Sequence, residues 1–225
     1  MIDVWLGSPA AEQWFDAGKL NAAERERYDG LRGERRRREF AVSRALRHAA
    51  LGHSLDNSSA PSSLSHSGGW AAFARAAAGQ RLGVDLEFHR PRNLLGIARF
   101  AFDPAEIAML EALQPAQRPA VFYALWTLKE SMAKALGLQL LVASRQCVFV
   151  AENPADAAAW RGSAPTEEPW MARVFQPQPD MALCITVIGS NDAGSIATRD
   201  WPSAVLAGKP GEWPSALTVR GGGGT

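Results

Sequence analysis

The residues best suited to chemistry lie in one stretch, residues 122–137, which reads FYALWTLKESMAKALG. On a helix of about 3.6 residues per turn, every fourth residue falls on one stripe, which here comprises Phe122, Trp126, Glu130 and Lys134. A carboxylate and an ammonium group therefore lie one turn apart, beside apolar residues that indicate a packed helix face. Taken alone, this spacing is also typical of an ordinary surface ion pair, which stabilises a helix by only about 0.2 to 0.5 kcal/mol.

A second acidic stretch, residues 83–87, favours a chemical role. Its sequence, GVDLE, alternates apolar and acidic residues as a β-strand does, which places Asp85 and Glu87 on one face, about 7 Å apart. Two such acids repel each other unless a cation lies between them, and a solvated outer strand face is the alternative interpretation. Together with Glu130 they suit a hard cation such as Mg²⁺, which completes its coordination with waters and substrate phosphates. The expected substrate is therefore a phosphate ester or anhydride.

Together these stretches resemble the signature of the 4'-phosphopantetheinyl transferase family, surfactin-synthetase-activating type. In that family a glycine, hydrophobic, Asp, any residue, Glu strand is followed by W-[ST]-x-K-E-[AS]-x-x-K, and residues 83–87 and 126–134 match both motifs throughout. A third family motif, S-H-S, is present at residues 65–67, where we expect a turn between two strand-like segments. The resemblance extends more loosely over most of the chain.

The resemblance implies an α+β fold built as a pseudo-dimer of two similar α+β halves, with the active site in the cleft between them. No internal repeat is visible in the residues themselves. We place the boundary near Gly79, so that residues 1–79 form an N-terminal half that recognises coenzyme A phosphates. Residues 80–220 then form a C-terminal half with the metal site and the motif helix, and residues 221–225, GGGGT, form a disordered tail.

The same resemblance implies Mg²⁺-dependent transfer of the 4'-phosphopantetheine arm from coenzyme A to a serine of an apo acyl or peptidyl carrier protein, releasing 3',5'-ADP. Asp85, Glu87 and Glu130 are the expected metal ligands. Glu130 is also the candidate base for the serine proton, and Lys134 is expected to bind the phosphates and stabilise charge that develops as the bond breaks. Lys129 lies on a different helix face, where we expect a structural or carrier-facing role.

Four further residues are candidates for binding coenzyme A. Arg44 lies in a helix-borne S-R-x-L pattern of the family, and its guanidinium suits bidentate binding of the 3'-phosphate, with Arg32 as a second candidate. Ser65 and His66 are placed on the pyrophosphate or the 3'-phosphate, because small residues let backbone N–H groups approach an anion and the imidazole can donate a hydrogen bond. At least half of the arginines near Arg44 are interpreted as a solvated helix face.

The chain departs from the family pattern in the segment before the S-H-S motif. A G-[KR]-P element and a Phe-Asn pair are both missing there, Ser62 and Ser63 replace the pair, and the downstream GKP at residues 208–210 is interpreted as coincidence. A noncatalytic module that binds coenzyme A or docks a carrier protein is therefore an alternative. A magnesium-dependent hydrolase would use the same acids, but the sequence offers no dedicated nucleophile or second metal cluster for one.

Composition agrees with a globular protein. The chain has 225 residues, 47% of them hydrophobic, which is enough for one domain or two tightly joined halves. No apolar run approaches the roughly 18 to 20 residues of a membrane span and no signal peptide is evident, so we expect a cytoplasmic monomer away from membranes. A net charge of +1 gives no strong overall attraction to nucleic acid. Cys147 and Cys184 are interpreted as small buried hydrophobes.

Hydrophobic periodicity, helix caps and turn residues predict the helices and strands that position these residues. A loop is expected at residues 53–63. A capped helix should run from Asp103 to about residue 113, and residues 114–119 should end it before the motif helix begins. The other expected helices are residues 10–17, Glu34–Leu51 and residues 93–102, and the other expected strands are Ile2–Gly7, residues 145–150, Trp170–Phe175 and Met181–Ile188.

Overall fold

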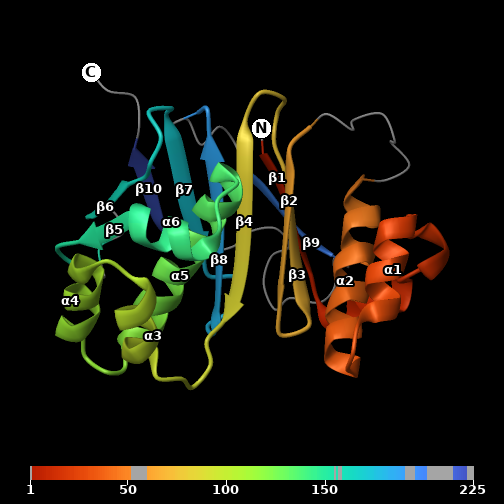
Figure 1. The fold of residues 1–225 in the computed structure, drawn as a ribbon, viewed down its shortest axis with the longest axis horizontal. Coiled ribbons are helices and arrows are strands. Elements are labelled where there is room, and N and C mark those ends of the chain that lie inside the picture. The colour runs from red at the N-terminus through yellow and green to blue at the C-terminus, as the bar shows by residue number, and fades with distance from the viewer. Residues whose placement is uncertain are drawn as a thin grey trace.

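Two four-stranded sheets form the centre of the protein, as Figure 1 shows for a computed structural model that describes residues 2–51, 60–154, 156, 159–190, 196–201 and 215–221. The first sheet has the order β2-β3-β1-β9, with bounds β2 (Ser62–Ser67), β3 (Trp70–Arg75), β1 (Ile2–Gly7) and β9 (Ile196–Trp201). The second has the order β10-β7-β8-β4, with bounds β10 (Ser215–Gly221), β7 (Trp170–Phe175), β8 (Met181–Ile188) and β4 (Arg81–Phe88). A separate ribbon pairs β5 (Val148–Ala151) with β6 (Trp160–Ser163).

Helices cover the outer side of each sheet (Figure 1). The short 3-10 helices η1 (Pro9–Trp14) and η2 (Ala17–Lys19) and the helices α1 (Ala22–Gly30) and α2 (Glu34–Leu51) accompany the first sheet. The second sheet is accompanied by α3 (Leu94–Ala101), α4 (Pro104–Ala112), α5 (Arg118–Leu136) and α6 (Leu140–Gln146). The predicted α+β class is confirmed. Among the described residues, no helix is both long and apolar enough to cross a membrane.

The described residues form three apolar cores that hold these layers together. One lies between α2 and the first sheet, where Val42 and Leu46 pack against Phe73. Another joins the two sheets, because β1 residues such as Val4 share it with β4 residues such as Val84. The largest lies between the second sheet and helices α3 to α6. The predicted division at residue 79 stays a prediction, and the parallel pairing of β9 with β1 brings a late segment of the chain into the first sheet.

The approach of α5 to β4 depends on a missing side chain. Within β4, Val84 and Leu86 face the core shared by the sheets, so Gly83 and Asp85 face the opposite way, toward α5. A Cβ atom on Gly83 would lie 1.8 Å from the backbone oxygen of Ser131, so only glycine lets the helix backbone lie directly on the strand. This contact sets the height of α5 above the acidic strand.

A buried ion pair fixes α5 from its other side. The Nζ atom of Lys129 lies 2.8 Å from an oxygen of Glu106 on α4, and the two side chains are 1% and 0% exposed. Lys129 also donates hydrogen bonds to the carbonyl oxygens of Ser144 and Cys147, at the end of α6. We expected either a structural or a carrier-facing role for Lys129. A side chain this deeply buried cannot contact a carrier protein, so its role is structural.

Several element boundaries differ from the predictions. Residues 10–17 are mostly 3-10 rather than α-helical, and α5 begins at Arg118, because Pro119 stands in the first turn, where a missing N–H costs no helical hydrogen bond. Arg145 lies in the last turn of α6, which ends at Gln146, instead of starting a strand, and β5 begins at Val148. Residues 65–67 lie within β2 rather than in a turn, which falls at Gly68 and Gly69. Residues 53–59, 208–210 and 222–225, which include parts of the predicted loop and tail, lie outside the described residues.

Candidate active site

Three carboxylates meet where β4 faces α5. Asp85 and Glu87 from β4 and Glu130 from α5 each offer an oxygen, and these ligand atoms all lie within 4.8 Å of one another. The Oδ2 atom of Asp85 is buried and has no hydrogen-bond partner among the described residues. A buried anionic oxygen without a partner is costly, and a cation bound there would supply the missing contact. The residues therefore fit a hard, oxygen-seeking cation such as Mg²⁺.

The other oxygen of Asp85 is fully engaged. Its Oδ1 atom accepts a hydrogen bond from the hydroxyl of Ser65 at 2.9 Å and another from Nζ of Lys134 at 2.9 Å. Lys134 also donates to the backbone oxygen of Val84 at 2.8 Å. Within the described part of the chain, the ion pair of Lys134 is thus with Asp85, and none is formed with Glu130 one turn away. The interpretation as a simple surface pair along the helix is wrong, because the tertiary fold presents a closer acid.

Alternate serines of β2 connect the two sheets at this point. The hydroxyl of Ser67 donates to Glu87 at 2.9 Å, as that of Ser65 does to Asp85, and the hydroxyl of Ser63 accepts the backbone N–H of Val84. Because these serines alternate along the strand, they all face β4. Ser65 therefore holds an expected metal ligand in place, which sequence reasoning did not anticipate. The matching alternation of SSLSHS and GVDLE is the signal that could have revealed it.

Glu130 is held by the aromatic end of its own helix stripe. The indole of Trp126 lies beside its carboxylate and is itself stacked on Phe122, with ring centroids 6.0 Å apart. Burial, followed by the negative charge of Asp85, raises the pKa of Glu130 to about 7, although Lys134 and Trp126 act in the opposite direction. Burial and Asp85 also raise the pKa of Glu87. The cluster is therefore too negative to be fully ionised near neutral pH without a cation.

A family model spans this whole cluster. Residues 81–185 match the 4'-phosphopantetheinyl transferase superfamily. The matched segment contains β4, α5 and all four charged residues of the cluster. The candidates of the first half, Arg32, Arg44, Ser65 and His66, lie before it.

Curated relatives carry the same family name. The chain is 38% identical to the 4'-phosphopantetheinyl transferase of Bacillus subtilis over 74 residues, which cover 33% of this chain and 32% of the relative. It is 40% identical to the 4'-phosphopantetheinyl transferase AcpT of Salmonella typhimurium over 33% of this chain and 38% of the relative. It is 29% identical to the 4'-phosphopantetheinyl transferase HetI of Nostoc sp. over 49% of this chain and 44% of the relative. The chain thus spans from about a third to less than half of the length of these curated relatives.

Of the candidate phosphate-binding arginines, Arg44 lies on α2 and Arg32 lies in the segment before it. The Nε atom of Arg44 lies 2.8 Å from Glu24, and the Arg44 side chain is 10% exposed, so its charge is already paired. The same oxygen of Glu24 also lies 2.9 Å from Arg47. Arg32 is exposed in the segment between α1 and α2. The assignment of Arg44 and Arg32 to the 3'-phosphate stays a prediction, and for Arg44 it requires the phosphate to compete with Glu24.

His66 lies on the face of β2 opposite the serines and looks toward α2. Its Nδ1 atom is 3.9 Å from Glu39. Burial lowers the pKa of His66, and Lys134 and Arg44 lower it further, whereas Glu39 raises it. These mutual effects place Lys134, His66 and the arginine helices within electrostatic reach of one another. An anion bound between them would meet several donors.

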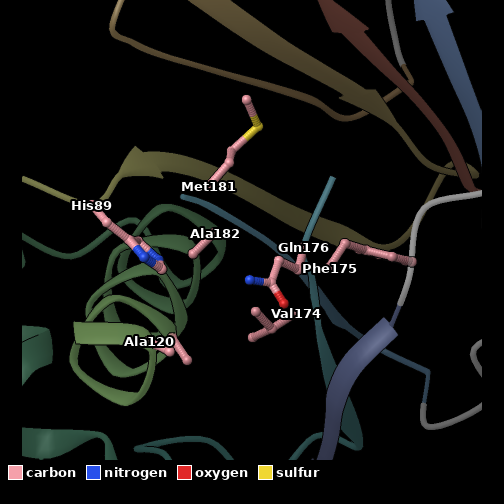
Figure 2. A pocket seen from close by; sticks show the side chains of 8 residues that line it. His89, Ala120, Val174, Phe175, Gln176, Met181 and Ala182 are labelled. Atoms are coloured by element: carbon pink, nitrogen blue, oxygen red, sulfur yellow. The ribbon is translucent and has the colours of Figure 1, made fainter. Parts of the chain in front are cut away.

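A small pocket lies beyond the Glu87 end of the cluster. It is lined by His89, Ala120, Ala124, Val174, Phe175, Gln176, Met181 and Ala182, and Figure 2 shows the imidazole of His89 pointing into it beside Ala182. His89 stacks on Tyr123 of α5, with ring centroids 4.8 Å apart. Tyr123, which sequence reasoning missed, therefore fixes the chain directly after the acidic strand. Its place one residue from the aromatic stripe gave no signal of this contact.

The raised pKa of Glu130 predicts how magnesium affects stability. The folded carboxyl titrates near 7 and the unfolded one near its ordinary value of 4.5, so between these pH values the folded state binds more protons and the metal-free protein loses stability as pH rises. Mg²⁺ requires the ionised cluster, so it should raise the melting temperature more at about pH 8 than at about pH 6. Thermal melts with and without Mg²⁺ measure this, and Glu130→Gln should reduce the pH dependence, of which Glu87, whose pKa is also raised, retains a part. Equal shifts at both pH values would contradict it.

Proposed function

We propose that this chain transfers the 4'-phosphopantetheine arm of coenzyme A to a serine of an apo carrier protein, releasing 3',5'-ADP. The observation that carries the proposal is the buried, unpartnered Oδ2 of Asp85 within a cluster of three acids and one lysine. The family match of residues 81–185 and the names of the curated relatives support it. The surfactin-synthetase-activating type is part of the proposal.

Asp85, Glu87 and Glu130 would hold the Mg²⁺. When bound, this ion offsets negative charge on the pyrophosphate and on the departing phosphate. Ser65 and Ser67 orient two of the ligands, because each donates its hydroxyl hydrogen to one carboxylate oxygen and leaves the other oxygen for the metal. Trp126 lies beside the third ligand, Glu130.

The chain's own residues would handle the proton and the charge of the reaction. The carrier serine oxygen forms a bond to the phosphorus of the arm while the bond from that phosphorus to 3',5'-ADP breaks, and we assign the serine proton to Glu130. Glu130 would accept this proton directly or through a water. Lys134 is held beside Asp85 at 2.9 Å, where its charge can stabilise phosphate oxygens as the bond breaks.

We assign coenzyme A phosphate recognition to residues 1–79 and the metal chemistry to residues 80–220. His66 and Ser65 would lie at the pyrophosphate, and Arg44 and Arg32 would bind the 3'-phosphate. The charges shared between His66, Arg44 and Lys134 support a phosphate path from α2 to the acidic cluster. A cytoplasmic location and a monomeric state are also part of the proposal.

Substitutions of Lys134 and Glu130 should have different effects on kcat and on the Mg²⁺ requirement. Lys134→Met removes charge that matters mainly in the transition state, so kcat should fall roughly a hundredfold with no higher Mg²⁺ requirement. Glu130→Gln removes a metal ligand, so kcat should fall and the Mg²⁺ requirement should rise together. Steady-state kinetics at several Mg²⁺ concentrations measure both, with the exposed Lys19→Met as a matched control. Near-normal kcat in a folded Lys134→Met protein would remove Lys134 from the mechanism.

The proposed function is tested by incubating the protein with coenzyme A, Mg²⁺ and a panel of apo carrier proteins. Intact mass should show the phosphopantetheine adduct on at least one carrier, and 3',5'-ADP should accumulate in equal amount. Tight binding of coenzyme A or a carrier without any adduct would favour the noncatalytic module. That alternative is motivated by the missing G-[KR]-P element. Phosphate-ester hydrolysis without an adduct would favour a hydrolase.

A further inference from the structure

An acid on α2 lies close to His66 and has no role in the proposed function. Glu39 begins the buried stretch of this helix, residues 39–46, and its side chain is only 12% exposed. In the ranges that the structure describes, its carboxylate accepts no hydrogen bond, and its ion pairs are both long, at 4.0 Å to Arg35 and 3.9 Å to His66. A buried carboxylate with such loose contacts is costly unless a partner comes closer.

The two partners of Glu39 differ in how well they can hold it. The Arg35 side chain is 70% exposed, so its attraction to Oε1 of Glu39 is screened by water. His66, at 41%, is the less exposed partner, and its Nδ1 atom faces the other oxygen, Oε2. The two nitrogens of an imidazole ring point in different directions, so Nε2 of His66 points away from Glu39. His66 can therefore pair with the carboxylate through one nitrogen and bind an anion through the other.

The other charged groups that act on His66 are cations. Burial is the largest cause that lowers the pKa of His66, and Glu39 raises it. Cations on three helices lower it further, namely Lys134 of α5, Arg27 of α1 and Arg44 of α2. On β3, the residue opposite His66 is the uncharged Ala71. A phosphate bound at His66 would place the imidazole between two anions, which favours its charged form.

The two ring nitrogens decide which form of His66 can bind a phosphate. A neutral imidazole carries one hydrogen, and a carboxylate at Nδ1 favours that position for it. Nε2 then presents only a lone pair, which repels a phosphate oxygen. A charged imidazolium carries a hydrogen on each nitrogen, so it can donate to Glu39 and to a phosphate at the same time. The carboxylate of Glu39 therefore selects the charged form of His66 for anion binding.

We propose that Glu39 is a positioning residue for phosphate binding, which holds a hydrogen on Nδ1 of His66 so that the charged imidazole binds a phosphate of coenzyme A through Nε2. This inference rests on the proposed function, which brings phosphates to His66. In the free protein the pKa of His66 is below its ordinary value, so at pH 7.5 the imidazole is mostly neutral and phosphate binding takes up a proton. The contribution of the charged imidazole is complete at low pH and is lost as the pH rises through the pKa of His66 in the complex.

The first test needs no ligand. NMR titration of ¹⁵N-labelled protein gives the pKa of each histidine, and His66→Asn identifies the signal of His66. In Glu39→Gln the pKa of His66 should fall, whereas Glu39→Asp, which keeps a carboxylate, should retain most of the wild-type value. Glu34→Gln, at an acid of the same helix whose side chain is 87% exposed, is the matched control and should leave it unchanged. Equal pKa values for His66 in wild type and Glu39→Gln would overturn the inference.

The second test measures coenzyme A binding by calorimetry, with Mg²⁺ and without a carrier, in buffers of different ionisation enthalpy. At pH 7.5 Glu39→Gln should take up fewer protons than wild type and bind coenzyme A roughly fivefold more weakly, but at pH 5.5 it should bind no more weakly. In a His66→Asn background the same substitution should cause no further loss, because Glu39 acts through His66. Melting curves show that each variant is folded.

The two tests separate this inference from the proposed function. Tighter binding of coenzyme A by Glu39→Gln at both pH values would overturn the inference alone, since Glu39 would then only repel the phosphates. An unchanged pKa of His66 in the free Glu39→Gln protein would do the same, whether or not a carrier is modified. No binding of coenzyme A by wild type would contradict the proposed function, and with it the phosphate step of the inference.

Discussion

Asp85→Asn should lower the rate of phosphopantetheine transfer by roughly a thousandfold while the protein stays folded. The amide can keep the hydrogen bonds that Ser65 and Lys134 donate to Oδ1, because its carbonyl oxygen accepts as the carboxylate does. Its NH₂ group then replaces Oδ2, the buried oxygen without a partner, and presents hydrogens where a cation would bind. The substitution therefore removes the metal site with little change in packing.

Three measurements on Asp85→Asn check this expectation. Adduct formation should be lost at all Mg²⁺ concentrations, and the rise in melting temperature on adding Mg²⁺ should disappear. The melting temperature without Mg²⁺ should not fall, because one of three repelling acids has become neutral. Glu26→Gln, at an exposed position of α1, is the matched control and should behave as wild type. Normal transfer by Asp85→Asn at limiting Mg²⁺ would rule out the shared metal site.

Gly83→Ala should have the largest effect on stability. The added methyl group would lie 1.8 Å from the carbonyl oxygen of Ser131 and 2.8 Å from the backbone nitrogen of Ala135, and neither atom can rotate away. The helix α5 must then lift off β4, which we expect to cost about 3 kcal/mol or more of unfolding free energy. Transfer should be lost as well, because Glu130 and Lys134 would move away from Asp85.

Chemical denaturation measures the stability of the Gly83→Ala protein, and adduct formation measures its activity. Gly30→Ala is a suitable control, since a Cβ at Gly30 would meet nothing within 4 Å and its φ is not positive. A Gly83→Ala protein with wild-type stability and activity would show that α5 does not lie on the strand as closely as the structure has it.

Local patterns were enough to predict many elements of this protein and the residues of its acidic cluster. Ile2–Gly7, Glu34–Leu51, Trp170–Phe175 and Met181–Ile188 have the predicted bounds, and Asp103 begins α4 with the predicted cap. Such features depend on the alternation, caps and stops of neighbouring residues. The acids were found because strand and helix periodicity place each on a defined face. The strands β6, β9 and β10 were missed, and β3 was expected only as a strand-like segment without bounds. Of these, β9 and β10 pair with strands that lie far away in the sequence, β1 and β7.

The partners of the charged groups depend on contacts between distant segments. Lys134 binds Asp85, 49 residues away, rather than Glu130 on its own helix, because Gly83 lets α5 lie against β4. Ser65 binds an acid instead of facing open solvent, because β2 lies beside β4. Arg44 is paired with Glu24 because α1 packs near α2. Short-range sequence patterns fix which face a side chain occupies, whereas the group it meets depends on which surfaces the folded chain brings together.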